Sequence, residues 1–426
     1  MNIIESKEAL DELLKSRRNE RPSQKLAEIV GSIIKRVAKE GDAAICEYTK
    51  QFDKCPLSPS KLKVSKREIE NAKCPPGLEK AIKNAAEGIR AFHEKQLRTP
   101  WKAEGPFGGS FGETYRPVRR AGIYVPAGTA PLVSSVLMSV IPAQVAGVKS
   151  ICVATPCNEE GKVNPGILAA CRLLGVHELY RGHGPSLVAA MCLGTRAIEK
   201  VDVIAGPGSA AVTEMKRQLF GTVSVDLIAG PSESLIIADE TAEPRFVAAD
   251  ILSQAEHHGS QTYIVTTSKK LAEAAAAEIV SLTENELAGA VEPAGLDRLN
   301  IVVVKDLKEA AKISNLIAPE HLQIMTKDDD GVLDMITNAG AVFLGKWTPV
   351  PMGDFAFGPS HVLPTGAAAA FMSGLSTATF LKRMSVMKAD EKGFKNMSQT
   401  MEVFSRYEQL PAHGFTSRVR KEKGLK

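Results

Sequence analysis

The sequence predicts an α/β protein with two incomplete doubly wound, Rossmann-like domains, a helical N-terminal segment and a helical C-terminal tail. Three observations predict this fold class. From Leu132 onward, short apolar, β-branched runs alternate with segments whose apolar residues recur at helical spacing, as in parallel sheets covered by helices. Glycines follow several of the helical segments, where helices commonly end. The 426 residues, 44% of them hydrophobic, are enough to bury more than one core.

The first part of the chain is predicted to be mainly helical. Residues 1–21 are charged, contain no apolar signal-peptide core and are predicted as a separate helical segment. Residues 25–41 repeat apolar residues at helical spacing and end on a glycine. A second helix is expected after a pair of prolines and runs to Arg98. TYRPVRRAGIYVPAG, residues 114–128, then predicts a strand and a turn.

Two runs of alternating strands and helices follow, at about residues 123–230 and 231–345. The expected strands are 149–156, 178–182, 201–208, 234–239, 262–268, 299–304, 321–325 and 341–345. The expected helices are 135–147, 164–175, 186–194, 209–221, one that ends at His257, an alanine-rich helix after residue 268, and one through Leu316. Residues 346–365 show no periodicity but many glycines and prolines, which favours an ordered functional loop.

These patterns predict a discontinuous domain with a second domain inserted into it. The first α/β domain is expected to comprise residues 22–122 and 231–375, and the second residues 123–230. Residues 376–426 are expected to form the helical tail. Small-molecule sites tend to lie where such halves join.

Composition excludes several classes of function. A net charge of +4, only 5% aromatic residues and no basic block with interleaved aromatics do not predict a nucleic-acid partner. No apolar run approaches the length of a membrane span, so no membrane partner is expected. The seven cysteines form no C-x-x-C pair, and several lie in apolar stretches. They are expected to be reduced core residues, which favours the cytoplasm.

Gln254 and His257 are the first candidates for a metal site. They lie three apart on a predicted helix, so they share a face and can address one point, whereas His258 points elsewhere. Imidazole is a good zinc ligand, and an amide oxygen can complete the coordination sphere. The alternative is a polar helix end with a cation near the C-terminal dipole, and the pair alone favours it.

Partners for this pair occur later in the chain. Asp354 and His361 lie in the expected functional loop, and Glu408 and His413 lie in the tail. Each residue alone is typical of an ordinary surface position. Taken together with the helix pair, they supply nitrogen and oxygen ligands for one divalent metal.

Glu320 and His321 stand side by side between a predicted helix and a predicted strand. A carboxylate beside an imidazole can divide proton transfers between the two groups, since the histidine pKa lies near working pH. The alternative is a helix-terminal cap, and the local sequence favours neither interpretation.

Two Gly/Pro turns that precede helices, at residues 122–135 and 206–211, are candidates for ligand contact, as is the junction of the two α/β runs. Gly206, Gly208 and Ala211 approximate a dinucleotide fingerprint between a strand and a helix, although an ordinary tight turn is the alternative because a proline separates the glycines. Ser232 lies in AGPSES, at the junction of the two α/β runs, and is expected to contact a substrate.

In this order, the motifs resemble the histidinol dehydrogenase family. The stretches that carry the resemblance are AGIYVPAGTAPLVSSVLM, VDVIAGPG, DLIAGPSESLIIAD, LSQAEH, IAPEHL, MGDFAFGPSHVLPTG and the C-terminal E-x-x-x-x-H. They cover nearly the whole chain and are highly specific as a set. The resemblance implies an oxidoreductase of histidine biosynthesis that oxidises L-histidinol through L-histidinal to L-histidine. It also implies one zinc ion per subunit and two NAD per reaction.

The resemblance also implies roles for individual residues. His321 would take the hydroxyl proton, and Glu320 would help to activate the water that attacks the aldehyde. The remaining implied contacts are zinc ligands at Gln254, His257, Asp354 and His413, substrate contacts at these four residues and at Ser232, His321 and Glu408, and NAD contacts in the second domain at Tyr124, Ser186 and Ser209. The family is a homodimer in which the tail, with Glu408 and His413, reaches the partner's site.

Two expected NAD positions depart from the family pattern. Ser186 stands where glutamine is frequent, and Ser209 stands where asparagine is usual. These changes would permit a non-catalytic metal- or ligand-binding protein on the same fold. A related zinc- and NAD-dependent dehydrogenase of another small alcohol is the other alternative function.

Overall fold

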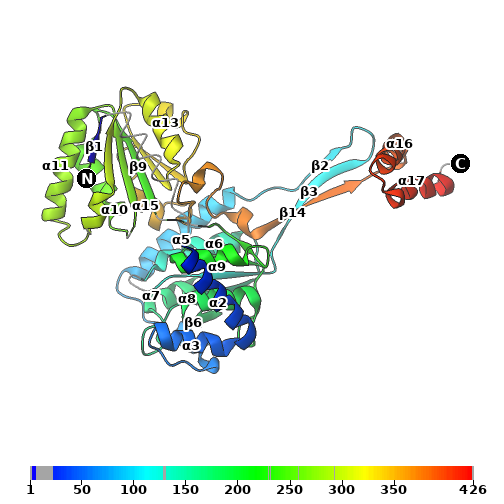
Figure 1. Cartoon of the computed structure of the whole chain (residues 1–426), viewed down its shortest axis with the longest axis horizontal. Coiled ribbons are helices and arrows are strands. Elements are labelled where there is room, and N and C mark those ends of the chain that lie inside the picture. Colours follow the sequence, from blue (N-terminus) through cyan, green and yellow to red (C-terminus); the bar gives the residue numbers. More distant parts are fainter. Residues whose placement is uncertain are drawn as a thin grey trace. The chain divides into compact units, whose positions relative to one another are not determined.

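The structure is a computed structural model that describes residues 2–5, 23–127, 131–228, 230, 232–257, 259–291 and 293–424. The chain divides into two compact units (Figure 1). Unit 1 comprises Met1–Gln96 and Val118–Phe380, and unit 2 comprises Leu97–Pro117 and Leu381–Lys426. Both α/β regions expected from the sequence belong to unit 1.

A six-stranded sheet in unit 1 has the order β1-β11-β10-β9-β12-β13, and every pairing is parallel. Its strands are β1 (Asn2–Ile4), β9 (Glu233–Ala238), β10 (Gln261–Thr266), β11 (Leu299–Val303), β12 (His321–Met325) and β13 (Ala341–Leu344). After β1 at the edge, the chain re-enters the sheet at β9, continues outward through β10 and β11, and then adds β12 and β13 on the other side of β9. This is the doubly wound order, with its switch point between β9 and β12.

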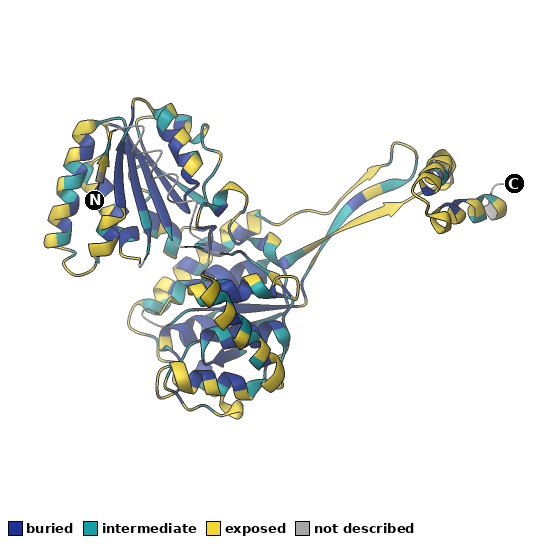
Figure 2. Cartoon of the chain, in the orientation of Figure 1, coloured by how far each residue is buried: buried dark blue, intermediate teal, exposed yellow. Residues whose placement is uncertain are grey.

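Helices cover both faces of this sheet because its strands are apolar on both sides. In β9, Ile236 and Ala238 pack against α10 (Pro244–Ala255) and α11 (Lys269–Glu284), as Figure 2 shows by the dark strands beneath them. Leu235 and Ile237 pack on the opposite face against α13 (Leu307–Ile317). Two further short helices in this region are α12 (Pro293–Asp297) and α14 (Asp329–Leu333).

A five-stranded parallel sheet repeats this winding, with the order β6-β5-β4-β7-β8. Its strands are β4 (Arg120–Tyr124), β5 (Ser150–Thr155), β6 (Leu179–Arg181), β7 (Val203–Ala205) and β8 (Ser224–Val225). The helices that follow its strands are α6 (Val133–Val145), α7 (Pro165–Leu173), α8 (Gly184–Leu193) and α9 (Ala210–Leu219). The switch point lies between β4 and β7, so two incomplete doubly wound sheets are present and the predicted fold class is confirmed.

The helices before this sheet contribute to its core. The first helices are α2 (Gln24–Glu40), α3 (Asp42–Phe52), η1 (Pro59–Lys61), α4 (Lys66–Glu70) and α5 (Leu78–Lys95). Val30 and Ile33 of α2 share one buried cluster with Leu187 of α8 and Tyr124 of β4. The prediction grouped residues 22–122 with the domain of residues 231–375. The buried apolar side chains of α2 instead lie against residues 123–230.

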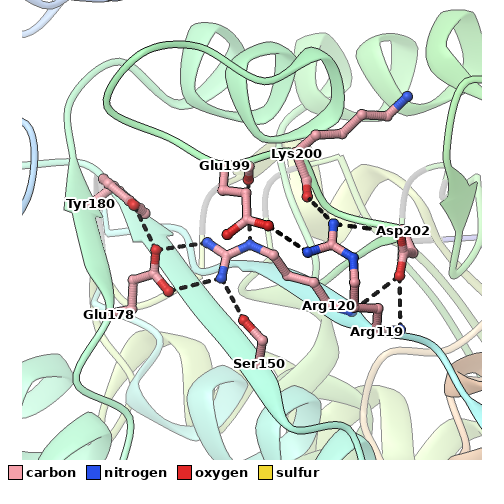
Figure 3. Close-up of polar contacts among 8 residues, drawn as sticks. All are labelled: Arg119, Arg120, Ser150, Glu178, Tyr180, Glu199, Lys200 and Asp202. Carbon is pink, nitrogen blue, oxygen red and sulfur yellow. Dashed lines mark hydrogen bonds and ion pairs between the residues drawn. The ribbon is translucent and has the colours of Figure 1, made fainter.

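An ion pair between Arg120 and Glu178 lies at the amino edge of the five-stranded sheet (Figure 3). Arg120, which is 1% exposed, donates through both terminal nitrogens to Glu178 at 2.8 and 2.7 Å. The Tyr180 hydroxyl donates to the same carboxylate at 2.6 Å. The neighbouring Arg119 pairs with Glu199, but both of these side chains are more than half exposed. Arg120 is therefore a structural residue whose buried positive charge is compensated by Glu178.

The N-terminal segment begins as a strand rather than a helix. Asn2–Ile4 form β1 and pair in parallel with Asn300, Ile301 and Val302 of β11. The helix prediction for residues 1–21 is wrong at this point, because the adjacent isoleucines extend an existing parallel sheet edge. Residues 6–22, which make up the rest of that segment, lie outside the described residues.

Unit 2 contains strands that the sequence patterns did not predict. β2 (Trp101–Glu104), β3 (Ser110–Pro117) and β14 (Leu381–Lys388) form an antiparallel sheet, in which Leu381 pairs with Pro117. Two helices follow, α16 (Glu391–Tyr407) and α17 (Pro411–Gly424). The predicted helical tail is thus present from residue 391, but it is preceded by a strand whose residues are mostly exposed (Figure 2).

Candidate active site

The candidate acid–base pair lies at the amino edge of the six-stranded sheet. His321 is the first residue of β12, and it is in register with Ser234 of β9. Ser232, a predicted substrate contact, precedes β9 at the same edge. Doubly wound sheets usually bind ligands at the carboxyl edge of the strands. The order of the strands alone would therefore have placed this site at the wrong edge.

Glu320 and His321 are both buried and lie in contact. Glu320 Oε2 is 3.8 Å from His321 Nδ1 and accepts a hydrogen bond from the backbone N–H of Glu233 at 3.2 Å. Burial raises the pKa of Glu320 to about 7, against the opposing charge of His321. Burial acts to lower the pKa of His321, but the charges of Glu320 and Asp354 raise it above its ordinary value. The pair is therefore suited to exchange a proton near neutral pH.

Asp354 connects this pair to the metal candidates. It lies in α15 (Val350–Phe355), a short helix within the loop predicted to be ordered. Its Oδ1 atom is 3.3 Å from His321 Nε2, and its Oδ2 atom accepts a hydrogen bond from Gln254 Nε2 at 3.2 Å. Burial acts to raise the pKa of Asp354, but contact with His321 and nearby imidazole charges hold it below its ordinary value. Asp354 is thus an anionic carboxylate beside an amide and an imidazole.

Gln254 and His257 lie at the end of α10, close to Asp354. The helix ends at Ala255, and a turn hydrogen bond of 3.2 Å from the His257 N–H to the Gln254 carbonyl continues the chain. His257 is therefore beyond the helix, not on it as predicted. Gln254 is 2% exposed, whereas His257 is exposed and interacts electrostatically with Asp354. His258 lies outside the described residues.

His361 positions Asp354 and is not available as a ligand. Its Nδ1 lies 2.8 Å from the Asp354 carbonyl oxygen, and its Nε2 lies 3.0 Å from the Ser135 hydroxyl oxygen. Both ring nitrogens therefore have protein partners, which argues against the predicted metal role. Through Ser135, the loop that carries Asp354 is tied to α6 of the five-stranded sheet.

The side chains near Asp354 fit a divalent metal in donor type. Gln254, His257 and Asp354 offer an amide oxygen, an imidazole nitrogen and a carboxylate, which zinc accepts. The ring nitrogens of His321 are buried and form no hydrogen bond of regular geometry within the described part of the chain, although Nε2 lies 3.3 Å from Asp354 Oδ1. In that same part of the chain, no three His, Cys, Asp or Glu side chains are grouped closely enough to hold a metal. The zinc ligand set stays a prediction.

The two tail residues belong to unit 2. Glu408 follows the last residue of α16, and His413 lies in the first turn of α17. Both side chains are exposed. Their expected contacts with substrate and zinc stay predictions.

The three expected NAD contacts lie at the carboxyl edge of the five-stranded sheet. Tyr124 ends β4 beside the switch point, Ser186 lies in the first turn of α8, and Ser209 immediately precedes α9. Neither helix begins with a side-chain cap, so their first N–H groups suit a pyrophosphate. The Ser186 hydroxyl, however, donates to the His183 carbonyl at 2.9 Å. This edge fits a dinucleotide mainly through its backbone.

Two contributors to the site were missed from the sequence. The Glu233 N–H holds Glu320, and the Ser135 hydroxyl holds His361. Ser135 is 226 positions away from His361, and Glu233 is 87 positions away from Glu320. Both residues lie within the motifs AGIYVPAGTAPLVSSVLM and DLIAGPSESLIIAD, but neither motif identifies their partners, because these contacts form only in the folded chain.

The chain is similar to known proteins over nearly its whole length. The sequence pattern of the family described as histidinol dehydrogenase matches residues 16–421. The chain belongs to the histidinol dehydrogenase family. Among the similar relatives, the histidinol dehydrogenase of Heliobacterium mobile is 43% identical over 92% of this chain and 93% of its own length. That of Carboxydothermus hydrogenoformans is 41% identical over 99% of both chains.

A solved structure shows that the histidinol dehydrogenase fold extends over the whole chain. The crystal structure of histidinol dehydrogenase from Elizabethkingia anophelis aligns with a TM-score of 0.91 and 37% identity, covering 99% of this chain and 97% of that one. The resemblance stated from the motifs is therefore confirmed. As a member of this family the chain is an NAD-dependent oxidoreductase.

Proposed function

We propose that the chain oxidises L-histidinol through L-histidinal to L-histidine with two NAD and one zinc ion per subunit. The observation that carries this proposal is the contact of Asp354 with both His321 and Gln254, at 3.3 and 3.2 Å. It brings a proton-transfer pair and a metal-ligand set to one carboxylate. Family membership gives the reaction class, and this geometry supports the assignment of residues.

The proposed zinc ligands are Gln254, His257 and Asp354, together with His413 of a partner subunit. A zinc ion bound there would act as a Lewis acid that grips the amino group and imidazole of histidinol. Ser232, at the amino end of β9, and Glu408 would contact the same substrate. The buried position of Gln254 excludes water from one side of the set.

The proton transfers are assigned to the buried pair. His321, as a neutral imidazole, takes the hydroxyl proton of the alcohol at Nε2, because Nδ1 faces Glu320 Oε2 at 3.8 Å. NAD bound in the second domain would supply the hydride acceptor for each of the two oxidation steps. Glu320, as a carboxylate, takes a proton from the water that adds to the aldehyde, and the protonated His321 returns its proton to the aldehyde oxygen, which gives the hydrate and a neutral imidazole. His321 then takes a proton from the hydrate as the second hydride leaves to a second NAD, which completes the four-electron oxidation.

The proposed homodimer is supported by apolar surface on unit 2. Phe404 and Tyr407 of α16 are 59% and 89% exposed, and Met387 of β14 is 80% exposed. Large apolar side chains exposed to this extent favour contact with another protein. A second copy of the chain is the proposed partner, with its tail bringing Glu408 and His413 to this subunit's site.

Two single variants, His257→Ala and His413→Ala, are each expected to be inactive when assayed alone.

Mixing those two variants tests the shared site. A mixed dimer would contain one intact site, so random exchange should restore about a quarter of full activity. No recovery after mixing would show that the two histidines serve the same subunit.

The cytoplasm is the proposed location. All seven cysteines are free thiols, as expected in a reducing compartment. Within the described ranges, no helix is both long enough and apolar enough to cross a membrane.

The test of the proposed function is NADH formation with L-histidinol and with a panel of other small amino alcohols. Histidinol should give the highest kcat/KM, and a chelator should abolish activity until zinc is returned. Preference for another alcohol would favour the alternative dehydrogenase. NAD binding without turnover of any alcohol would favour a non-catalytic protein.

A further inference from the structure

A buried ion pair outside the acid–base site holds the turn that follows β7. Lys216 of α9 and Asp226 after β8 are 4% and 0% exposed, and their Nζ and Oδ1 atoms are 2.7 Å apart. Asp226 Oδ2 accepts the Gly206 N–H at 2.8 Å, and Lys216 Nζ donates to the Gly206 carbonyl. The pair therefore holds both backbone polar groups of one residue.

Gly206 is the residue at which this turn meets Tyr124. Its φ of 110° lies in the region that favours glycine. A Cβ atom at this position would lie 2.1 Å from the Tyr124 carbonyl oxygen. The turn therefore crosses directly against the end of β4, at the switch point of the five-stranded sheet. A small change at Gly206 would move the start of α9 relative to Tyr124.

The chemistry of the pair points to positioning rather than stability. Taking two charges out of water is costly, and apolar residues of the same size often stabilise a fold equally well. Two apolar side chains, however, could not form hydrogen bonds with the N–H and the carbonyl of Gly206. The pair thus fixes the direction of a turn whose backbone leads to the uncapped N-terminus of α9.

We propose that Lys216 and Asp226 are positioning residues for the dinucleotide. They hold the Gly206–Gly208 turn so that the first N–H groups of α9 and Tyr124 form one surface for NAD. This inference rests on the proposed NAD site at the carboxyl edge of this sheet. Neither residue is placed in contact with the cofactor, and neither was singled out by a sequence motif.

The first test is a double variant, Lys216→Met with Asp226→Asn, which is uncharged and close to the native volume. NAD affinity is measured by titration on zinc-loaded protein, and KM for NAD is measured alongside. The dissociation constant and KM for NAD should both rise about tenfold, the usual effect of one lost buried hydrogen bond. The kcat at saturating NAD, the KM for histidinol and the zinc content should stay within about twofold of the unmodified protein.

A matched control lies on the same helix. Arg217 pairs with Glu214 within α9 at 2.6 Å and does not bond to the turn. Arg217→Met should leave NAD affinity unchanged. If the double variant does not fold, Asp226→Glu replaces it, because it keeps the ion pair but shifts the carboxylate that holds Gly206. That variant should also bind NAD more weakly.

The outcomes separate this inference from the proposed function. A folded double variant, or a folded Asp226→Glu, with NAD affinity within twofold of the unmodified protein would overturn the positioning role. An equal loss in Arg217→Met would overturn it too. Failure of the unmodified protein to oxidise histidinol would instead overturn the proposed function, while the titration with NAD alone still decides the role of the pair.

Discussion

His321 Nε2 lies 3.3 Å from Asp354 Oδ1, so the residue suited to proton transfer touches a proposed metal ligand. Asp354 uses its other oxygen to accept from Gln254. Its backbone carbonyl is held by His361. Asp354 thus contacts both a proton-transfer residue and a proposed metal ligand. Substitutions at His257 and at Glu320 should therefore separate metal binding from proton transfer.

Substitution of His257 should remove metal and activity together. His257→Ala deletes an imidazole that interacts electrostatically with Asp354 and is itself exposed. The zinc content after gel filtration should fall from one per subunit to well below it, and NADH formation should fall with it. Glu256→Ala, at the adjacent exposed residue, is the control and should keep both. Full zinc content in His257→Ala would show that the ligand assignment is wrong.

Substitution of Glu320 should remove activity but leave the zinc content unchanged. Glu320→Gln keeps the shape of the side chain but cannot accept a proton from water. The zinc content should stay at one per subunit, while turnover of histidinol should fall by roughly 10²- to 10⁴-fold, the usual loss for a general base. A turnover within threefold of the unmodified protein would mean that Glu320 only holds the backbone at the start of β9.

The Arg120–Glu178 pair should contribute to stability and not to catalysis. Glu178→Ala leaves a buried guanidinium without its carboxylate, which costs about 3–5 kcal/mol in comparable proteins. Arg119→Ala, the control, removes an exposed pair with Glu199 and should cost about 0–1 kcal/mol. The free energy of unfolding in urea measures both. Equal losses for the two variants would contradict the structural role given to Arg120.

Asp53 should make stability depend on pH. Burial raises its pKa from 3.8 to about 6, and Oδ2 has no hydrogen-bond partner in the described structure. The folded state therefore binds the proton more tightly, so this group's contribution to stability falls as pH rises from 3.8 to about 6. Asp53→Asn should stabilise the protein by about 1 kcal/mol at pH 8, after allowance for partial exposure.

The test is urea unfolding of both proteins at pH 5 and pH 8. The gain from Asp53→Asn should be smaller at pH 5, where the native carboxyl is largely protonated. A gain that is larger at pH 5, or a loss at pH 8, would contradict the pKa shift.

Local patterns predicted the elements of unit 1 well. The alternation of apolar runs located β9 and β10, and glycine correctly ended α2 at Glu40. Glu320 and His321 were expected between a helix and a strand, and the structure has them there. Such features depend on neighbours in sequence, so the sequence alone reveals them.

Long-range pairing was not predictable in the same way. β14 pairs with β3 across more than two hundred residues, and its mostly exposed side chains give no apolar signal. Which edge of the sheet carries Glu320 also depends on how distant strands pair in the folded chain. The Glu233 N–H that holds Glu320 belongs to a neighbouring strand, and a backbone donor has no sequence signature.

The most direct test of the central claim is the number of NADH molecules formed per L-histidinol consumed by zinc-loaded protein. The assigned roles of His321 and Glu320 predict two NADH per histidinol, with histidine as the product and no free aldehyde. One NADH per histidinol with release of the aldehyde, or no NADH, would contradict the four-electron oxidation proposed for this site.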